Sequence, residues 1–389
     1  MSGAVAFPDW KVTLDGVDLS AKLRPYLISL RVSERRGGEA DQLDIELDDS
    51  GQTLDIPKAG AVLDLSLGWK GGGGTTAGLT SKGSFTVDSA NHSGPPDRIT
   101  VRARSADFTA EWRKLRDQTW RDTTLRTVLG AVAARQNVTL KIAASLGGKA
   151  VKLVTQSRES DHALIARLGK ENDAVATVKQ GNLVFVPMAG GKSASGEALP
   201  TVTILKTEGD GHSYDIDARE DYTGVVAKWH DKKAASEKLV KVEKRKRAKG
   251  AVPKVGPPKT STAANQSTSG TKDNPKVLKK VFPTEAEARR AAEAEWQRIQ
   301  RAPRKLSLTL ALGRPEIGVE QPALAKGFHP EIDAQDWVVA EATHTLDGKG
   351  LTTSLSFELP DNPPEGGAES ESEAASQPEE TTPVNNEEE

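Results

Sequence analysis

Strict alternation of apolar and polar residues constrains this chain more than any other feature. In the first hundred residues, apolar side chains occupy every second position in four separate runs. These runs are Leu43–Asp48, Leu63–Leu67, Phe85–Asp88 and Ile99–Arg104. A period of two places the apolar side chains on one face of an extended strand. The runs therefore predict an antiparallel sheet that covers a core on one side.

The pattern changes to α/β after Phe108. Asp122 is a candidate N-cap for a helix whose apolar residues share one face, and Asn137 is a candidate end for it. Ser160 or Asp161 is predicted to open a second helix. The strand patterns 175–178 and 183–186, joined by Gln-Gly-Asn, indicate a hairpin. Residues 108–190 are thus predicted to form a small α/β insert.

Strand patterns return beyond a linker-like stretch at 190–200. A segment at about 230–275, rich in Lys, Ser, Thr and Pro, is predicted to be irregular because it offers little apolar surface to bury. Thr284 and Glu287 have capping-box spacing, which predicts a helix over about 284–301 with Trp296 on its apolar stripe. We expect that stripe to pack on a β-barrel. Apolar residues alternate with polar ones at 306–312, which predicts another strand, and residues 347–350 are predicted to form a hairpin turn.

The predicted fold class is mainly β with an α/β insert. The chain is predicted to contain two tube-type antiparallel β-barrel domains, at 1–107 and 191–360, with the insert 108–190 between them. The second barrel domain carries the helix at about 284–301 and the basic irregular segment at about 230–275. Residues 361–389 are rich in acidic residues and contain no basic ones, so a disordered acidic tail is expected.

Composition excludes several function classes. The chain has no cysteine, which rules out disulfides, thiolate metal sites and cysteine nucleophiles. Its 53 basic and 55 acidic side chains nearly cancel, so there is no overall nucleic-acid signature. No apolar run has the length of a membrane helix, and no signal peptide is visible. We expect a protein made in the cytoplasm, without a membrane anchor.

No motif supports a catalytic, cofactor-binding or metal-binding residue. Gly191-Lys192-Ser193 ends like a phosphate-binding loop, but Val186 stands where that loop needs its first glycine. The glycine run 71–74 does not lead into a helix and is expected to be a flexible loop. None of the histidines has zinc-site spacing; they are His92, His162, His212, His230, His329 and His344. The acidic stretch Glu208–Asp221 fits no calcium loop and is interpreted as a solvated loop.

A basic run is the other charged feature. Its members are Lys241, Lys244, Arg245, Lys246, Arg247, Lys249, Lys254 and Lys259. Such a run could grip phosphates, but it lacks the aromatic residues that would stack on bases. A solvated loop and electrostatic docking to an acidic partner remain the alternatives. We expect no sequence-specific nucleic-acid binding.

Several segments together resemble the late control protein D family, the hub proteins of contractile phage tails. They are Ser93–Phe108, Leu115–Trp120, Gln156–Asp161, Ala286–Pro315 and His344–Thr353. Their order along the chain matches the family and covers most of residues 10–360. The family is in turn similar to the N-terminal part of VgrG-type spikes.

The resemblance implies a structural, non-enzymatic hub of a contractile tail baseplate or a phage-derived injection particle. It implies a homotrimer that adapts a sixfold tail tube to a threefold spike. The implied partners are the spike, the tail tube or tape-measure proteins and other baseplate proteins, and the implied location is the virion tail, assembled in the host cytoplasm. A baseplate-associated cell-wall hydrolase and a nucleic-acid-binding late regulator are the alternatives. The sequence leaves open the channel-lining residues, the spike-contact face and the host.

Overall fold

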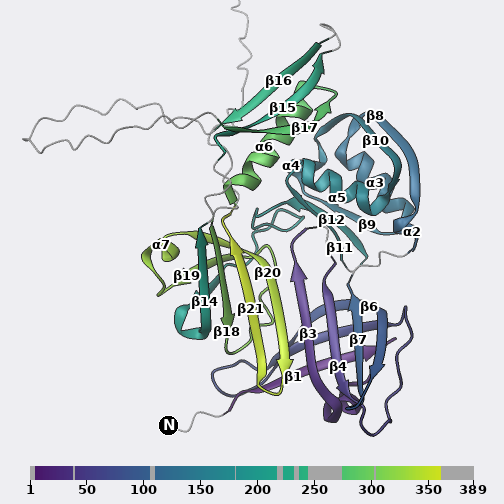
Figure 1. Ribbon diagram of the computed structural model, residues 1–389, viewed down its shortest axis with the longest axis vertical. Coiled ribbons are helices and arrows are strands. Elements are labelled where there is room, and N and C mark those ends of the chain that lie inside the picture. Colours follow the sequence, from purple (N-terminus) through teal and green to yellow (C-terminus); the bar gives the residue numbers. More distant parts are fainter. Residues whose placement is uncertain are drawn as a thin grey trace, which may run out of the picture.

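The computed structural model describes residues 5–37, 40–105, 110–179, 181–216, 222–231, 236–243, 274–301 and 304–360. Figure 1 shows a large sheet at one end of the molecule. The α/β insert and a smaller sheet with a long helix lie together at the other end. The chain is mainly β, as predicted, and its longer helices lie in these two smaller units.

The first half of the large sheet comes from the N-terminal hundred residues. Its strands are β1 (Phe7–Leu14), β2 (Val17–Asp18), β3 (Leu27–Arg35), β4 (Gln42–Asp48), β5 (Val62–Gly71), β6 (Gly78–Ser93) and β7 (Arg98–Arg104). The helix α1 (Ser20–Leu23) and a 3-10 turn (Arg24–Tyr26) precede β3. All four alternating runs predicted from the sequence are strands here. Their apolar residues share one core with Trp10 and Trp69.

The second half is built from residues beyond 200. Its strands are β13 (Val202–Leu205), β14 (Gly209–Ile216), β18 (Arg304–Leu310), β19 (Pro322–Lys326), β20 (Asp336–Asp347) and β21 (Gly350–Glu358). A 3-10 turn (Lys206–Glu208) precedes β14, and the short helix α7 (Pro330–Asp333) precedes β20. This half has its own core, in which Trp337 and Phe357 are the largest buried side chains.

The described strands of the two halves form one sheet, and the prediction of two separate β-barrel domains is not confirmed. In the described part of the chain, 13 strands follow an open path β14-β18-β21-β20-β3-β4-β7-β6-β5-β1-β2, with β19 and β13 branching from β20. The joint is an antiparallel pairing of β20 with β3, from Glu341 opposite Arg35 to Leu346 opposite Leu30. Among the described strands, this path does not close into a barrel. The sequence pattern identified the strands but carried no information about this long-range pairing.

The α/β insert lies between the two halves in sequence. It contains α2 (Ala110–Arg113), β8 (Leu115–Thr124), α3 (Leu125–Arg135), β9 (Thr139–Ile142), α4 (Ala144–Gly147), β10 (Ala150–Ser160), α5 (Asp161–Glu171), β11 (Ala174–Lys179) and β12 (Asn182–Pro187). β8 pairs with β10, and β11 and β12 form the predicted hairpin, on which β9 adds in parallel.

The helix boundaries in the insert are partly as predicted. Ser160 caps α5 by accepting a hydrogen bond from the Ala163 amide. Asn137, just past the end of α3, has a left-handed φ of 54°, as expected of a residue that stops a helix. Asp122 does not cap α3, because β8 continues to Thr124, and Thr124 accepts the bond from the Thr127 amide instead.

A third unit corrects two further expectations. The strands β15 (Gly224–Asp231), β16 (Ser236–Glu243) and β17 (Pro275–Phe282) form a separate sheet, and α6 (Glu285–Arg301) packs on it. Part of the segment predicted to be irregular is therefore a strand. The α6 stripe covers this three-stranded sheet and not a barrel, and Trp296 is only half-buried there. Thr284 accepts a hydrogen bond from the Glu287 amide, which confirms its capping role.

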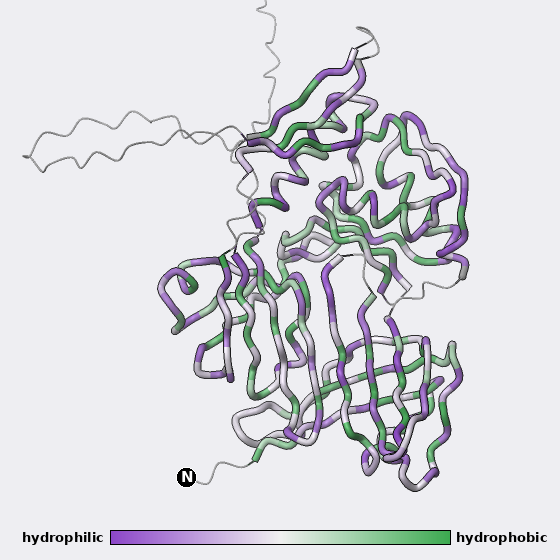
Figure 2. The backbone as a smooth tube through the Cα atoms, viewed as in Figure 1, coloured by the Kyte–Doolittle hydropathy of each residue, from purple (hydrophilic) through white to green (hydrophobic). Residues whose placement is uncertain are grey.

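Figure 2 shows the alternation of hydrophilic and hydrophobic residues along the strands of the large sheet.

In the described residues, no helix is long and apolar enough to cross a membrane. Residues 244–273, which hold most of the basic run, and the acidic tail 361–389 lie outside the described residues.

Candidate functional site

The feature with the most concentrated chemistry is a buried ionic junction at the joint between β3 and β20. The register places Ala342 opposite Glu34, and His344 two residues further along the same face of β20. Ala342 and His344 share a face of β20, because residues two apart on a strand lie on the same side. Glu34 lies opposite Ala342, so the side chains of Glu34 and His344 both point into the core. Thr353 of β21 lies opposite His344, and its Oγ1 is hydrogen-bonded to the His344 Nδ1 at 2.8 Å.

Lys82 supplies the counter-charge of Glu34. Its Nζ lies 3.3 Å from both carboxylate oxygens, and its side chain is 4% exposed. Lys82 is the extra residue of a β-bulge, since Gly83 pairs with Leu65 and Ser81 pairs with the next residue, Ser66. Bulges re-aim side chains. This bulge explains how a lysine reaches the interior from the long strand β6.

The protonation of this group follows from its surroundings. Burial raises the pKa of Glu34, but the His344 imidazole beside it and the charge of Lys82 outweigh burial and hold the pKa at about 2. Burial lowers the pKa of His344, so the imidazole is neutral at pH 7. Burial also lowers the pKa of Lys82, and the charge of Glu34 opposes that effect. Glu34 and Lys82 thus form the charged pair, and His344 is a neutral neighbour.

A second ion pair, between Lys179 and Asp41, connects the insert to the large sheet near β3. Lys179, at the end of β11, contacts Asp41 at 2.8 Å, and the Arg35 amide donates to the same carboxylate at 3.3 Å. Asp41 is 3% exposed, and burial raises its pKa while Lys179 opposes that shift. The hairpin of the insert is therefore fixed to the strand β3 side of the large sheet.

A third group ties the end of β3 to the second half. Arg36 contacts Glu320 at 2.7 Å and Glu358 of β21 at 3.0 Å. Burial raises the pKa of Glu320, against the opposing charge of Arg36. The Trp69 indole donates to the Gly313 carbonyl at 2.8 Å, which adds a neutral link between the halves. All three groups join elements that are far apart in sequence.

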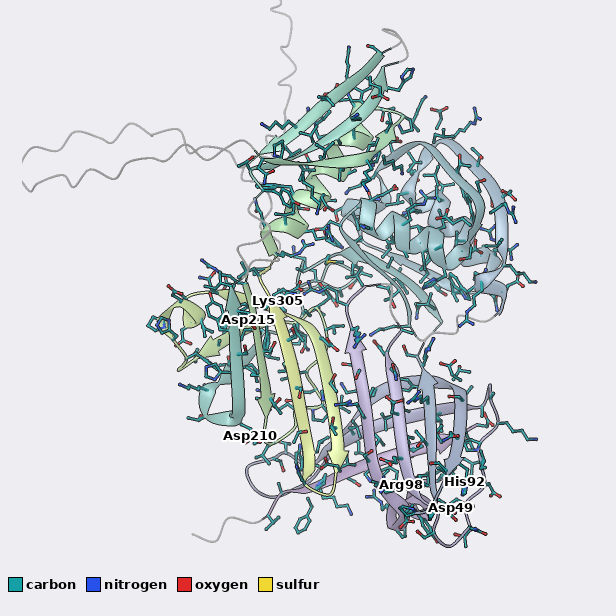
Figure 3. All side chains as sticks on the ribbon, viewed as in Figure 1. Asp49, His92, Arg98, Asp210, Asp215 and Lys305 are labelled. Atoms are coloured by element: carbon teal, nitrogen blue, oxygen red, sulfur yellow. The ribbon has the colours of Figure 1, made fainter. Side chains whose placement is uncertain are left out.

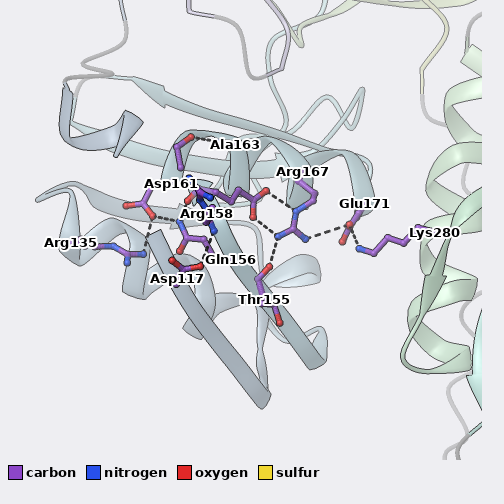
Figure 4. Close-up of polar contacts among 12 residues, drawn as sticks. Asp117, Arg135, Thr155, Gln156, Arg158, Asp161, Ala163, Arg167, Glu171 and Lys280 are labelled. Atoms are coloured by element: carbon purple, nitrogen blue, oxygen red, sulfur yellow. Dashed lines mark hydrogen bonds and ion pairs between the residues drawn. The ribbon is translucent and has the colours of Figure 1, made fainter. Parts of the chain in front are cut away.

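A separate network joins the insert to the α6 unit, and Figure 4 shows part of it. Arg167 of α5 donates to Glu159 at 2.7 and 2.9 Å, and Glu171 pairs with Lys280 of β17. At the end of α6, Arg301 forms a buried ion pair with Asp173, which precedes β11. The α6 unit is thus connected to the insert by charged contacts at two places.

The sequence-based site candidates do not converge. Figure 3 shows His92 and Asp49 close together near Arg98, at the start of β7. The His92 Nε2 lies 3.4 Å from the Asp49 carboxylate, and His212 packs edge-on against Phe328. His329 caps α7. His162 lies in α5, His230 in β15 and His344 in the junction. Within the described ranges, no group of three or more His, Cys, Asp or Glu residues is placed to hold a metal ion.

The glycine-lysine-serine segment and the acidic stretch do not form binding sites in the described residues. The Ser193 amide donates to the Glu197 carbonyl in a tight turn, and no helix follows directly on Gly191-Lys192-Ser193, so these residues do not form a phosphate loop. Figure 3 shows Asp210 and Asp215 on the edge strand β14, where Asp215 lies opposite Lys305 of β18. The rest of the acidic stretch, from residue 217 to 221, lies outside the described residues, as does the basic run beyond Glu243.

Sequence reasoning missed the ionic junction. Its members sit at residues 34, 41, 82, 179 and 344 and share no local motif. One signal in the sequence pointed to it. Glu34 and His344 are polar residues at positions where the alternation of their strands places buried apolar side chains. Apart from Lys179, whose side chain is 35% exposed, the side chains of the junction are buried. Together with the Arg36 group, they connect the two halves of the large sheet and the insert.

Comparison with known proteins gives a consistent result. A family model described as "Phage tail baseplate hub (GPD)" matches residues 39–350. A "Probable baseplate hub protein" of Escherichia phage P2 is 38% identical over 371 residues, which covers 92% of this chain and 95% of that protein.

Two solved structures share the fold. The 43 kDa tail protein of prophage MuSo2 from Shewanella oneidensis has a TM-score of 0.61 at 15% identity, covering 91% of this chain and 99% of that one. The half-lidded PdpA-VgrG complex of Francisella has a TM-score of 0.52 at 8% identity, covering 92% of this chain and 60% of that one.

Proposed function

The chain belongs to the phage tail baseplate hub (GPD) family, and from this premise we propose that three copies assemble into a ring at the tail axis. A structural role in the tail baseplate, within the virion tail, is established by the family. The trimer, its partners and the absence of catalysis are the proposal. Each half of the large sheet acts as one tube unit in this scheme, and the spike lies on one side of the ring.

One observation carries the proposal. A single chain presents two β units side by side, each with its own core, joined edge to edge by β3 and β20. Three such chains would place six β units around an axis while keeping threefold symmetry. The open edges at β14 and at β1 and β2 leave backbone groups that neighbouring copies can pair with.

A structural role also suits the ion pairs of Arg36. A ring that transmits force between tube and spike needs its two β units held in a fixed relation. The pairs of Arg36 with Glu320 and Glu358 cross from one β unit to the other and specify one relative position, because any slip separates opposite charges in a poorly solvating interior. We propose that the chain works without catalysis. The described histidines lie on separate segments, and none of their positions favours the alternative of a cell-wall hydrolase.

The test is a mass measurement by light scattering of the purified chain, alone and mixed with the spike protein of the same tail. We expect a complex with three hub chains when the spike is present. A complex with one hub chain per spike trimer, or with six, would contradict the proposal. A monomer without spike is compatible with it only if the mixture yields the three-chain complex.

A further inference from the structure

The α6 unit, which comprises β15, β16, β17 and α6, connects to the large sheet at one place. The chain leaves the sheet after β14 and returns to it at β18. These strands are antiparallel neighbours, and Ile216 at the end of β14 lies opposite Arg304 at the start of β18. Figure 1 shows the unit extending from there along the insert. A unit that is joined to its neighbour at one place can rotate about that place unless contacts elsewhere hold it.

The α6 unit and the insert do not share a core. Within the described residues, no buried apolar cluster contains side chains of both. Where their apolar side chains face each other, they line a cleft of about 590 Å³. Leu153 of β10 and Val281 of β17, which lie on its two sides, remain 37% and 41% exposed. Relative motion is expected of units whose interface is not large and hydrophobic.

Polar contacts hold α6 against the start of β10. The Lys152 amide donates a hydrogen bond to the Glu287 carboxylate at 2.8 Å. The Arg290 guanidinium donates one to the Ala150 carbonyl at 2.7 Å. Both backbone groups belong to exposed residues, and water can replace both side chains. These contacts therefore align the two units without fixing them permanently.

The two ion pairs between the units differ in burial. Arg301, at the end of α6 and shortly before Arg304, pairs with Asp173, and these side chains are only 3% and 7% exposed. Lys280 of β17 pairs with Glu171 of α5, and these side chains are 49% and 23% exposed. Breaking a buried pair is strongly destabilising, whereas an exposed pair contributes little. The pair next to the large sheet is therefore the one that persists when the other contacts open.

We propose that the α6 unit is a hinged body that swings away from the insert, with the Arg301–Asp173 pair at the pivot and the Lys280–Glu171 pair as the latch. Opening breaks the latch and the two hydrogen bonds to β10, and it exposes the apolar side chains that line the cleft. The movement is a property of the single chain and does not require the ring. It can therefore fail while the proposed hub assembly stands.

The experiment measures a distance between the two units in the full-length chain with a pair of spin labels. Because the chain has no cysteine, T119C/S236C places both labels without further substitutions. Thr119 lies on β8 of the insert, and Ser236 begins β16, at the end of the small sheet away from Gly224. The reference pair is T119C/K170C, in which both labels lie on the insert. All labelled positions are exposed. Pulsed dipolar spectroscopy gives the distance distribution at low and high salt.

The latch variant is K280Q, which removes the charge that Glu171 faces across the interface. The matched control is R289Q, which removes the same charge from a pair with Glu285 within α6. Each substitution is introduced into both labelled chains, and circular dichroism confirms that every variant is folded.

We expect short and long distances in the labelled wild type, with the ratio of long to short rising about two- to fivefold from low to high salt, because salt screens the latch. K280Q should raise that ratio by a similar factor at low salt and weaken its salt dependence, whereas R289Q should behave like the wild type. The reference pair should give one unchanged distance. A single distance between the units that neither salt nor K280Q alters would overturn the proposal. An equal response to K280Q and R289Q would overturn it as well.

Discussion

Glu34 is the residue on which the ionic junction depends most. Glu34→Gln keeps the shape of the side chain but leaves the buried Lys82 ammonium without a counter-charge. We expect a loss of about 3–5 kcal/mol in the free energy of unfolding at pH 7, measured with guanidinium chloride. The control is Glu285→Gln, whose partner Arg289 is exposed and on the same helix, and which should cost at most about 0.5 kcal/mol. Similar losses in the two variants would show that the junction is not special.

The same residue predicts a pH dependence. The folded pKa of about 2 lies below the ordinary value of 4.5, so Glu34 stabilises the native state fully above about pH 4.5. That contribution, about 3 kcal/mol, is lost as the pH falls from about 4.5 to 2. Asp41 and Glu320 have raised pKa values and act in the opposite direction, so the comparison with Glu34→Gln isolates the effect. The stability difference between wild type and variant should shrink across this range. A constant difference would contradict the assignment.

At the scale of elements, the docking of α6 on the insert depends on the buried pair of Arg301 and Asp173. Asp173→Asn tolerates the left-handed backbone at this position, where φ is 48°, but removes the charge that Arg301 needs. We expect a loss of about 3–5 kcal/mol. Hydrogen exchange should show a larger loss of protection in α6 than in β3. If protection changes equally in both, α6 is not a separately docked element.

The elements themselves were largely predictable, and their pairing was not. Period-two alternation identified β4, β5 and β7, and the Ser160 and Thr284 caps located two helix starts. The strand β16 was missed because its apolar residues, such as Leu239 and Val240, stand among lysines and glutamates in a segment of low-complexity composition. The β3–β20 joint and the Glu34–Lys82 pair depend on contacts between residues far apart in the chain, and no local pattern encodes those.

At the scale of the whole molecule, every described element ends by Glu358. The cores of the described chain are built from residues that precede Pro360. We therefore expect truncation after Pro360 to leave the circular dichroism spectrum unchanged and the melting temperature within about 2 °C, since a change that removes no packing costs little stability. A truncated chain that melts clearly earlier would show that residues 361–389, predicted to be a disordered tail, are part of the fold.

In the proposed assembly, one chain supplies two β units to a threefold ring. A reconstruction of the assembled tail tip by electron cryomicroscopy would show whether it does. We expect three copies of this chain around the axis, with the β14 edge of each copy next to the β1 and β2 edge of its neighbour. Six copies, a single copy, or a ring in which these edges face solvent would contradict it.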